Sequence, residues 1–73
     1  MGRLNGFNRK EVLKRLKRAG FIKSRKGTNH ELLWHPERDL LVAVPRHAGD
    51  IAEGTMVNIL RQAGLTVDEF LAL

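Results

Sequence analysis

The chain has 73 residues, no cysteine and a formal net charge of +5 at pH 7. A domain of this size buries only about 60% of its unfolded surface, which excludes a separate cofactor-binding domain and limits the fold to one small sheet with two or three helices. The absence of cysteine excludes disulfides and thiolate metal sites and fits a reducing cytoplasm, and no apolar run approaches the roughly 18 residues of a membrane span. We therefore expect one cytoplasmic domain over residues 1–73.

Charge is distributed unevenly along the chain. Residues 1–35 contain ten Lys and Arg against two acidic residues (+8), whereas residues 36–73 contain three against six (−3). A polarised small protein presents a cationic face that attracts polyanions, nucleic acid first, and leaves another face for different contacts. Solubilisation of a helix is the simpler explanation of these cations, but an average domain mixes its signs more evenly.

The first expected element is a helix that follows Asn8 and ends at Gly20. Asn8 can cap its start, and Glu11 stands three residues later, which is the spacing of a capping box. Glycine is frequent just past the end of a helix. One face of this helix is apolar, and the opposite face carries Lys10, Lys14, Lys17 and Arg18.

Three antiparallel strands are expected next, at residues 21–26, 30–35 and 40–44, with a hairpin turn at residues 36–39. In the second strand the period of two separates two sets of side chains. His30, Leu32 and Trp34 share one face, and Glu31, Leu33 and His35 share the other. The third strand is a run of leucine and β-branched residues that is typical of a well-covered strand, and Pro45 stops it.

Residues 46–54 are expected to be irregular, and two helices follow. Apolar residues at helical spacing from Met56 to Ala63 precede Gly64, and Thr66 and Glu69 have capping-box spacing at the start of a last short helix. The order helix, three strands, helix, short helix predicts an α+β fold with both main helices on one face of the sheet.

The turn Lys26-Gly27-Thr28-Asn29-His30 is the candidate site. Histidine both accepts and donates a proton near neutral pH, glycine lets the backbone approach a ligand closely, and neighbouring cations favour an anionic ligand. RNA carries its own nucleophile, the 2′-hydroxyl, so a ribonuclease needs a base, cations and help for the leaving group, but no metal or other cofactor.

One hypothesis from these residues is that His30 is the general acid or base of a ribonuclease. The phosphate is expected to be held by Arg25, Lys26 and the backbone amides of Gly27, Thr28 and Asn29, with Lys10, Lys14 and Lys17 as further RNA-binding residues. Arg46 and His47 are expected to contact RNA or a partner, although His47 can equally cap the following segment.

Simpler explanations exist for several of these side chains. On chemistry alone, a lone histidine at a strand start is more often a surface or hydrogen-bonded residue than a catalyst, and His35 is expected to be structural or solvated. A metal shared by His30, His35 and His47 is disfavoured because the first two face opposite ways. Trp34 alternates with Leu32, so a place in the core or against a partner is favoured over base stacking.

Three segments resemble the HicA family of toxins, small ribonucleases of bacterial toxin–antitoxin pairs. They are KGTNHELLWHP at residues 26–36, VPRH at 44–47 and GTMVNILRQAGL at 54–65, and the resemblance covers nearly the whole chain. It implies a double-stranded-RNA-binding-domain-like fold, cleavage of messenger RNA and His30 as the catalytic residue. It also implies a HicB antitoxin that covers the active face, with the toxin monomeric when alone and hetero-oligomeric with its antitoxin.

The chain departs from the common family pattern at two positions. Thr28 stands where serine is frequent, which keeps the hydroxyl. Glu31 directly follows His30, where many members carry a neutral or basic residue, and a carboxylate there could weaken RNA affinity locally. Two alternative functions stay open at this point: a non-catalytic module that grips double-stranded RNA by shape, and a subunit whose basic face meets an acidic protein.

Overall fold

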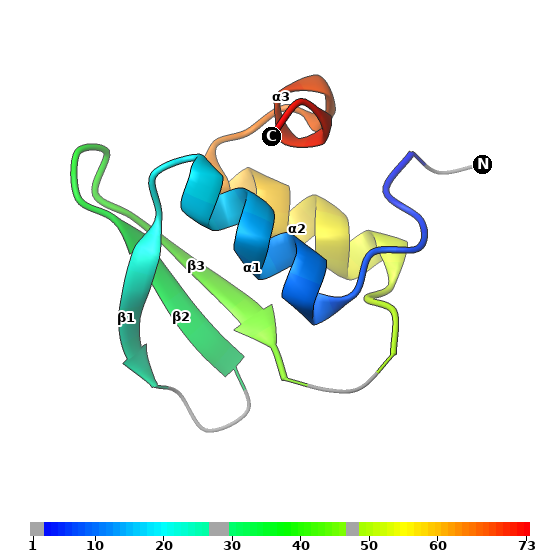
Figure 1. Ribbon diagram of the computed structural model, residues 1–73, viewed down its shortest axis with the longest axis horizontal. Coiled ribbons are helices and arrows are strands. Elements are labelled where there is room, and N and C mark those ends of the chain that lie inside the picture. The colour runs from blue at the N-terminus through cyan, green and yellow to red at the C-terminus, as the bar shows by residue number, and fades with distance from the viewer. Residues whose placement is uncertain (1–2, 27–29, 47–48) are drawn as a thin grey trace.

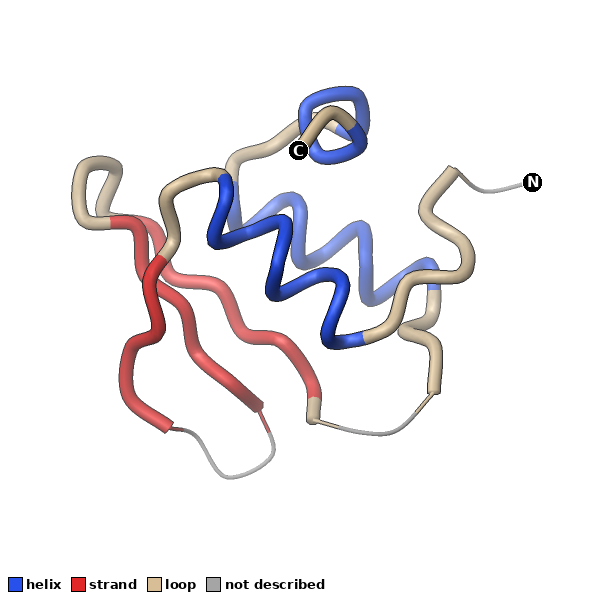
Figure 2. The backbone as a smooth tube through the Cα atoms, viewed as in Figure 1, coloured by secondary structure: helices blue, strands red, loops and turns tan. Residues whose placement is uncertain are grey.

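A computed structural model describes residues 3–26, 30–46 and 49–73, with the side chains of residues 25 and 26 outside the described part. The elements follow in the order α1 (Arg9–Arg18), β1 (Ile22–Lys26), β2 (His30–His35), β3 (Leu40–Pro45), α2 (Glu53–Ala63) and α3 (Val67–Leu71). Both α1 and α2 cover the same face of the sheet, and α3 lies beyond them (Figures 1 and 2). The predicted α+β architecture is confirmed.

The sheet has the order β1-β2-β3, and both strand pairs are antiparallel. At one end of β2, Trp34 pairs with Ile22 of β1 and with Leu41 of β3, while at the other end His30 pairs with Pro45. Alternate residues of β2 are buried beneath the helices, and the residues between them face away from the helices. The predicted division of this strand into two faces is therefore confirmed.

The core lies between the sheet and the helices. Apolar side chains of the sheet and of the helices form it, and each contributes about 1.5–3 kcal/mol when fully buried. Its principal members are Val12 and Leu16 of α1, Leu33, Val42 and Val44 of the sheet, and Met56, Ile59 and Leu60 of α2. This core fixes which face of α1 turns inward, and therefore which face of α1 carries its lysines into solvent.

The ends of α1 follow the predicted signals with one difference. The Asn8 side chain accepts a hydrogen bond from the Glu11 backbone N–H at 2.9 Å, so the N-cap is confirmed. The Glu11 carboxylate does not complete a capping box, because it accepts a hydrogen bond from Nε of Arg15 one turn later at 3.0 Å. Gly20 follows the helix with a φ of +106°, a conformation that favours glycine.

Three predicted boundaries were wrong by one or two residues, the first because β1 begins at Ile22 rather than at residue 21. β3 continues through Pro45, and α2 begins at Glu53, so Gly54 lies inside a helix rather than in an irregular segment. The chain before α2 is already held in place, because the Ile51 N–H donates to the Phe7 carbonyl at 2.7 Å. The acidic Glu53 in the first turn also favours a helix start, since carboxylates stabilise helix N-termini.

The outer edge of β3 is partly covered by a side chain of α2. The backbone N–H of Ala43 donates a hydrogen bond to the Oε1 atom of Gln62 at 2.9 Å. The predicted capping box of α3 is complete, with Thr66 and Glu69 bonded to each other's backbone N–H groups. None of the helices in the described residues is long and apolar enough to cross a membrane.

Candidate functional site

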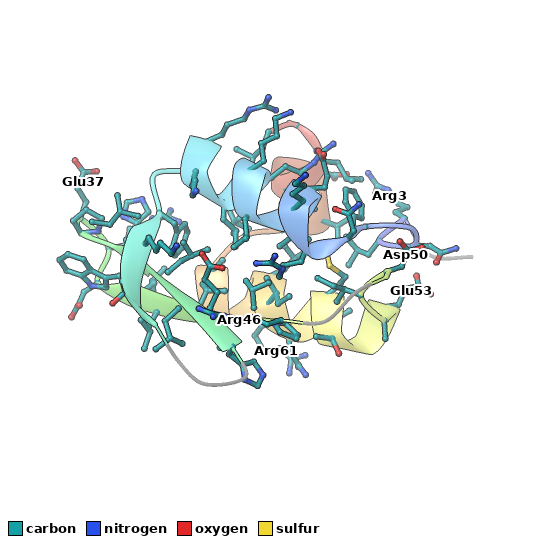
Figure 3. The ribbon with its side chains drawn as sticks, turned by 60° about the horizontal axis from the view of Figure 1, so that its bottom comes forward. Arg3, Glu37, Arg46, Asp50, Glu53 and Arg61 are labelled. Carbon is teal, nitrogen blue, oxygen red and sulfur yellow. The ribbon has the colours of Figure 1, made fainter. Side chains whose placement is uncertain are left out.

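His30 is the first residue of β2, and its side chain is exposed at one end of the sheet. Its register partner is Pro45, the last residue of β3, and Arg46 follows directly. Figure 3 shows Arg46 at the opposite end of the sheet from Glu37, which lies in the turn between β2 and β3. The start of β2 and the VPRH segment, two parts of the predicted site, therefore meet at the same end of the sheet.

The remaining residues of the predicted turn fall mostly outside the described part of the chain. Gly27, Thr28, Asn29 and His47 lie outside the described residues, as do the side chains of Arg25 and Lys26. The Lys26 backbone is described, and it pairs with Glu31 at the start of β2. The phosphate-binding roles expected for this turn therefore stay predictions.

Glu31, directly after His30, turns toward the helices and is buried, with 8% of its side chain exposed. Its Oε1 atom lies 3.1 Å from Nη1 of Arg9, and its Oε2 atom lies 3.6 Å from Nζ of Lys23. A buried carboxylate requires such partners, because taking an unpaired charge out of water is costly. Arg9 and Lys23 thus balance the charge of Glu31, the carboxylate that was expected to weaken RNA affinity locally.

Arg9 and Lys23 were not among the predicted site residues. Glu31 holds the first turn of α1 and the start of β1 next to the candidate catalytic histidine. The only sequence signal for these ion pairs was Glu31 itself, because it is one of only two acidic residues among the first 35. The same 35 residues include ten Lys and Arg, so the sequence could not show which of these cations Glu31 would pair with.

Arg46 has unused hydrogen-bonding capacity. Its Nε atom is buried without a hydrogen-bond partner, and no carboxylate of the described residues forms an ion pair with it. Buried N–H groups are paired in the great majority of cases, so an exception beside a candidate site is informative. The planar guanidinium of arginine matches the geometry of a phosphate. Arg46 is therefore a candidate phosphate ligand by its side-chain type and its place directly after the register partner of His30.

The cations of α1 divide into two sets. Arg9 and Arg15 form ion pairs inside the fold, with Glu31 and Glu11. The second set is exposed and forms no ion pair with a carboxylate of the described residues: Lys10, Lys14, Lys17 and Arg18. Arg9 contacts Glu31, the residue after His30, so the cationic face of α1 begins next to the site. Lys17 lies about 10 Å farther along the helix than Lys10.

His35 belongs to the fold rather than to the site. Its ring is buried, with Nε2 3.2 Å from the Ala19 carbonyl oxygen, and Nδ1 accepts a hydrogen bond from the Arg38 N–H at 3.2 Å. These partners fit the neutral tautomer that carries its proton on Nε2. The ring also meets Phe21 edge to face. Of the two roles expected for His35, structural or solvated, the structure shows the first.

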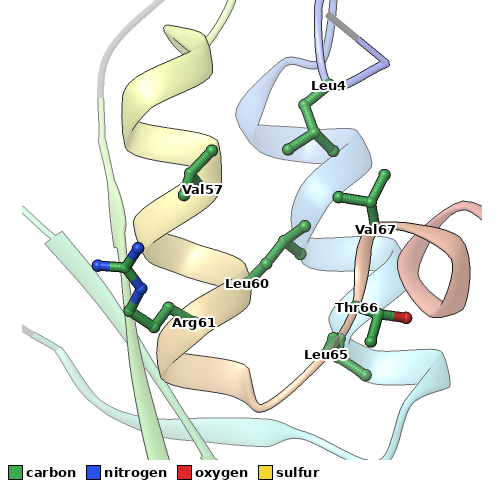
Figure 4. Close-up of a pocket in the computed structure, with 7 residues that line it drawn as sticks. All are labelled: Leu4, Val57, Leu60, Arg61, Leu65, Thr66 and Val67. Atoms are coloured by element: carbon green, nitrogen blue, oxygen red, sulfur yellow. The ribbon is translucent and has the colours of Figure 1, made fainter.

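The described residues show neither a metal-binding cluster nor a pocket at the candidate site. They contain no group of three or more His, Asp or Glu side chains arranged to hold a metal ion. A hollow of about 280 Å³ lies elsewhere, between α2, Leu4 and the segment before α3 (Figure 4). Its walls are mostly aliphatic, and Figure 4 shows the Arg61 guanidinium directed away from them. None of the predicted site residues lines this hollow.

A comparison with protein families gives a match over most of the chain. Residues 9–65 match the family model described as the HicA toxin of bacterial toxin-antitoxin systems. The match begins at the first residue of α1, ends two residues after α2, and includes the whole sheet with His30 and Arg46. No curated protein is significantly similar to the chain.

Proposed function

Because the chain belongs to the HicA family of toxins of bacterial toxin-antitoxin systems, we propose that it is an endoribonuclease that cleaves messenger RNA with His30 as general acid or base. Membership of this family implies a toxin role and a HicB-type antitoxin as partner. The observation that carries the enzymatic proposal is the exposed imidazole of His30 at the end of the sheet where Arg46 and the cationic face of α1 begin.

The proposed reaction uses the RNA's own 2′-hydroxyl as nucleophile. His30 takes the proton of this hydroxyl, the oxygen attacks the adjacent phosphorus, and the bond from phosphorus to the 5′-oxygen breaks. The leaving 5′-oxygen takes a proton from water, so the products are a 2′,3′-cyclic phosphate and a 5′-hydroxyl, and His30 returns its proton to the solvent. No step requires a metal ion, because the nucleophile and the base are both present.

The cations around His30 would stabilise the charge that develops on the phosphorane. Arg46 is proposed as a phosphate ligand because it directly follows Pro45, the register partner of His30, and its planar guanidinium matches a phosphate. Arg25, Lys26 and the backbone amides of Gly27, Thr28 and Asn29 complete the proposed phosphate site. Lys10, Lys14 and Lys17 bind phosphates farther along the RNA. Glu31 does not oppose this binding, because Arg9 and Lys23 balance its charge.

Replacement of His30 by alanine tests the assignment. We expect His30→Ala to lower the rate of RNA cleavage by about 10²- to 10⁴-fold while RNA affinity stays nearly unchanged, because a general acid or base acts on the transition state. Gel analysis of the RNA ends and a filter-binding assay measure the two quantities. Cleavage at the wild-type rate would remove His30 from the mechanism, and RNA that is bound but left intact by both proteins would identify a non-catalytic RNA-binding module.

The identity of the nucleophile has its own test. An RNA with a single 2′-deoxy sugar at the cleavage position should bind normally and resist cleavage, whereas a deoxy sugar one residue away should not protect it. Normal cleavage of the first substrate would show that water attacks instead. Cleavage should also persist in excess chelator, and its loss would show that a metal ion takes part.

A further inference from the structure

The sheet face that turns away from the helices carries a row of three exposed apolar side chains. Ile22, Trp34 and Leu41 are direct register partners across β1, β2 and β3. They are 50%, 36% and 54% exposed, and they account for three of the four large apolar side chains exposed in the described part of the chain. Directly opposed residues in an antiparallel sheet lie on the same face and touch. The three side chains therefore form one continuous patch, here named the apolar row.

The strands β2 and β3 contribute no charged side chain to the face that carries the apolar row, and the carboxylate of Asp39, in the turn between them, is hydrogen-bonded to Trp34. The positions of β2 and β3 on this face are His30, Leu32, Trp34, Leu41, Ala43 and Pro45, and none is Lys, Arg, Asp or Glu. RNA binding depends largely on cations that contact phosphates, and four exposed cations of this kind, Lys10, Lys14, Lys17 and Arg18, lie on α1. An apolar patch with an aromatic centre is typical of a protein interface.

Trp34 is held in one orientation before any partner arrives. Its indole Nε1–H donates to the Asp39 Oδ1 atom at 3.0 Å, across the turn that joins β2 to β3. Asp39 has a φ of +54°, so its backbone conformation is part of this tight turn. A side chain that is already fixed loses little conformational entropy on binding, and tryptophan is among the residues that contribute most to protein interfaces.

The apolar row and His30 lie on one continuous surface. Trp34 and His30 face the same side of β2 and are four residues apart, or about 13 Å along the strand. A protein interface of ordinary size covers roughly 800 Å² per partner, a patch roughly 30 Å across. A protein centred on the apolar row therefore also covers the imidazole of His30.

We propose that the apolar row of Ile22, Trp34 and Leu41 is the anchor on which the HicB-type antitoxin docks, so that the bound protein covers His30 from the open face of the sheet. The occupant is identified by the partner that membership of the family implies, by the apolar chemistry of the row and by its continuity with His30. That the bound antitoxin blocks RNA cleavage rests on the proposed function of His30. That it docks on the apolar row does not.

The test compares two lysine substitutions with the same change in charge. Leu41→Lys places a charge in the apolar row, and Val57→Lys places one at a similarly exposed residue, 44%, on α2. We expect Leu41→Lys to weaken the affinity for the cognate antitoxin by about 10-fold or more in calorimetry, and Val57→Lys to change it by no more than about 2-fold. Equal affinities for the two variants would overturn the proposal, and so would a loss confined to Val57→Lys.

The same variants separate the docking proposal from the catalytic one. Leu41→Lys should cleave RNA at the wild-type rate, because Leu41 has no part in the proposed chemistry. If the wild-type chain cleaves no RNA but Leu41→Lys still loses the antitoxin, the proposed function fails and the docking surface stands. If Leu41→Lys keeps the antitoxin but loses RNA binding, the apolar row binds RNA. If it keeps the antitoxin but dissociates a dimer of the chain, the row binds a second copy. Either result would overturn the proposal.

Trp34 also provides a direct probe, because it is the only tryptophan in the chain. Labelling the chain with 5-fluorotryptophan gives a single fluorine resonance, which the unlabelled antitoxin cannot obscure. We expect this resonance to shift when the antitoxin is added and to stay in place when RNA with 2′-deoxy sugars is added. A resonance that moves with RNA and not with the antitoxin would overturn the proposal.

Discussion

His30 and His35 belong to the same strand and yet have opposite surroundings. Because side chains alternate along a strand, a separation of five residues turns one ring to solvent and the other beneath the helices. His30 has an exposed side chain at the edge of a cationic surface, whereas His35 has a partner at each ring nitrogen. Substitutions should therefore separate activity from stability at these two positions.

We expect His35→Ala to lower the free energy of unfolding by about 1–3 kcal/mol, because it leaves the Ala19 carbonyl and the Arg38 N–H without their partner. Cleavage by the protein that remains folded should be unchanged. His30→Ala is the matched control and should leave stability unchanged while removing cleavage. Urea denaturation and an RNA cleavage assay measure the two quantities, and a large loss of stability in His30→Ala would contradict this separation.

Gly20 allows the His35 ring to reach the end of α1. A Cβ atom at Gly20 would lie 2.7 Å from Nε2 of His35, and the φ of +106° disfavours any other residue. We therefore expect Gly20→Ala to destabilise the protein by at least about 1–2 kcal/mol.

Gly54 provides the control for this substitution, because it lies in α2 with no atom within 4 Å of an added Cβ. Gly54→Ala should stabilise the protein by about 0.4–1 kcal/mol, since alanine loses less backbone freedom on folding. Thermal unfolding of both variants checks these opposite signs, and a shift in the same direction for both would contradict the account.

At the scale of whole elements, one side chain of α1 connects that helix to the end of the chain. The Arg15 guanidinium donates hydrogen bonds to the carbonyl oxygens of Phe70 and Leu71 at 3.2 and 3.1 Å. It also lies over the rings of Phe7 and Phe70, 5.1 and 5.5 Å from their centroids. The last carbonyls of a helix have no partner within the helix, so Arg15 satisfies groups that α3 cannot satisfy itself.

We expect Arg15→Met to destabilise the protein by about 1–3 kcal/mol, because methionine retains the apolar stem but not the donors. A helix of five residues is marginal without such contacts, so α3 should also exchange its amide hydrogens faster. Arg18→Met removes the same charge from the exposed face of α1 and serves as the control. Equal hydrogen exchange of α3 in both variants would show that Arg15 does not hold it.

The elements were largely predictable from the sequence, because each has a local signal. Alternation identified β2, Asn8 and Gly20 marked α1, and the spacing of Thr66 and Glu69 marked α3. Contacts between elements have no such signal. The pairing of Glu31 with Arg9 and Lys23 was not predicted, because it depends on how α1 crosses the sheet. Trp34 was assigned to the core or a partner, and only its register with Ile22 and Leu41 on an open face excludes the core.

For the molecule as a whole, the cations and the apolar row lie on different layers. The lysines project from the outer side of α1, which covers one face of the sheet, while the apolar row occupies the other face. His30 lies at the end of β2, where both surfaces can be reached. Under the proposals made above, RNA and antitoxin approach from different sides and compete at this one residue.

The salt dependence of RNA binding tests the cationic surface. We expect the double substitution Lys10→Gln, Lys17→Gln to reduce the slope of log affinity against log salt by about 1.4–1.8, because each phosphate contact contributes about 0.7–0.9. The double substitution Arg38→Gln, Arg61→Gln removes the same charge from the β2–β3 turn and from α2, and it should reduce the slope much less. Equal slopes for the two double variants would show that RNA responds to net charge alone.

The hydrogen bond from Ala43 to Gln62 has a consequence for how this small sheet avoids polymerising. An exposed strand edge offers unpaired N–H and carbonyl groups to any other extended chain, and growth by strand addition is the usual route to fibres. At β3 one outward N–H is already occupied by a helix side chain, so an added strand would have to displace that bond. The exposed apolar row therefore favours partners that pack against the face of the sheet. The bond at the edge of β3 disfavours chains that would add a strand there.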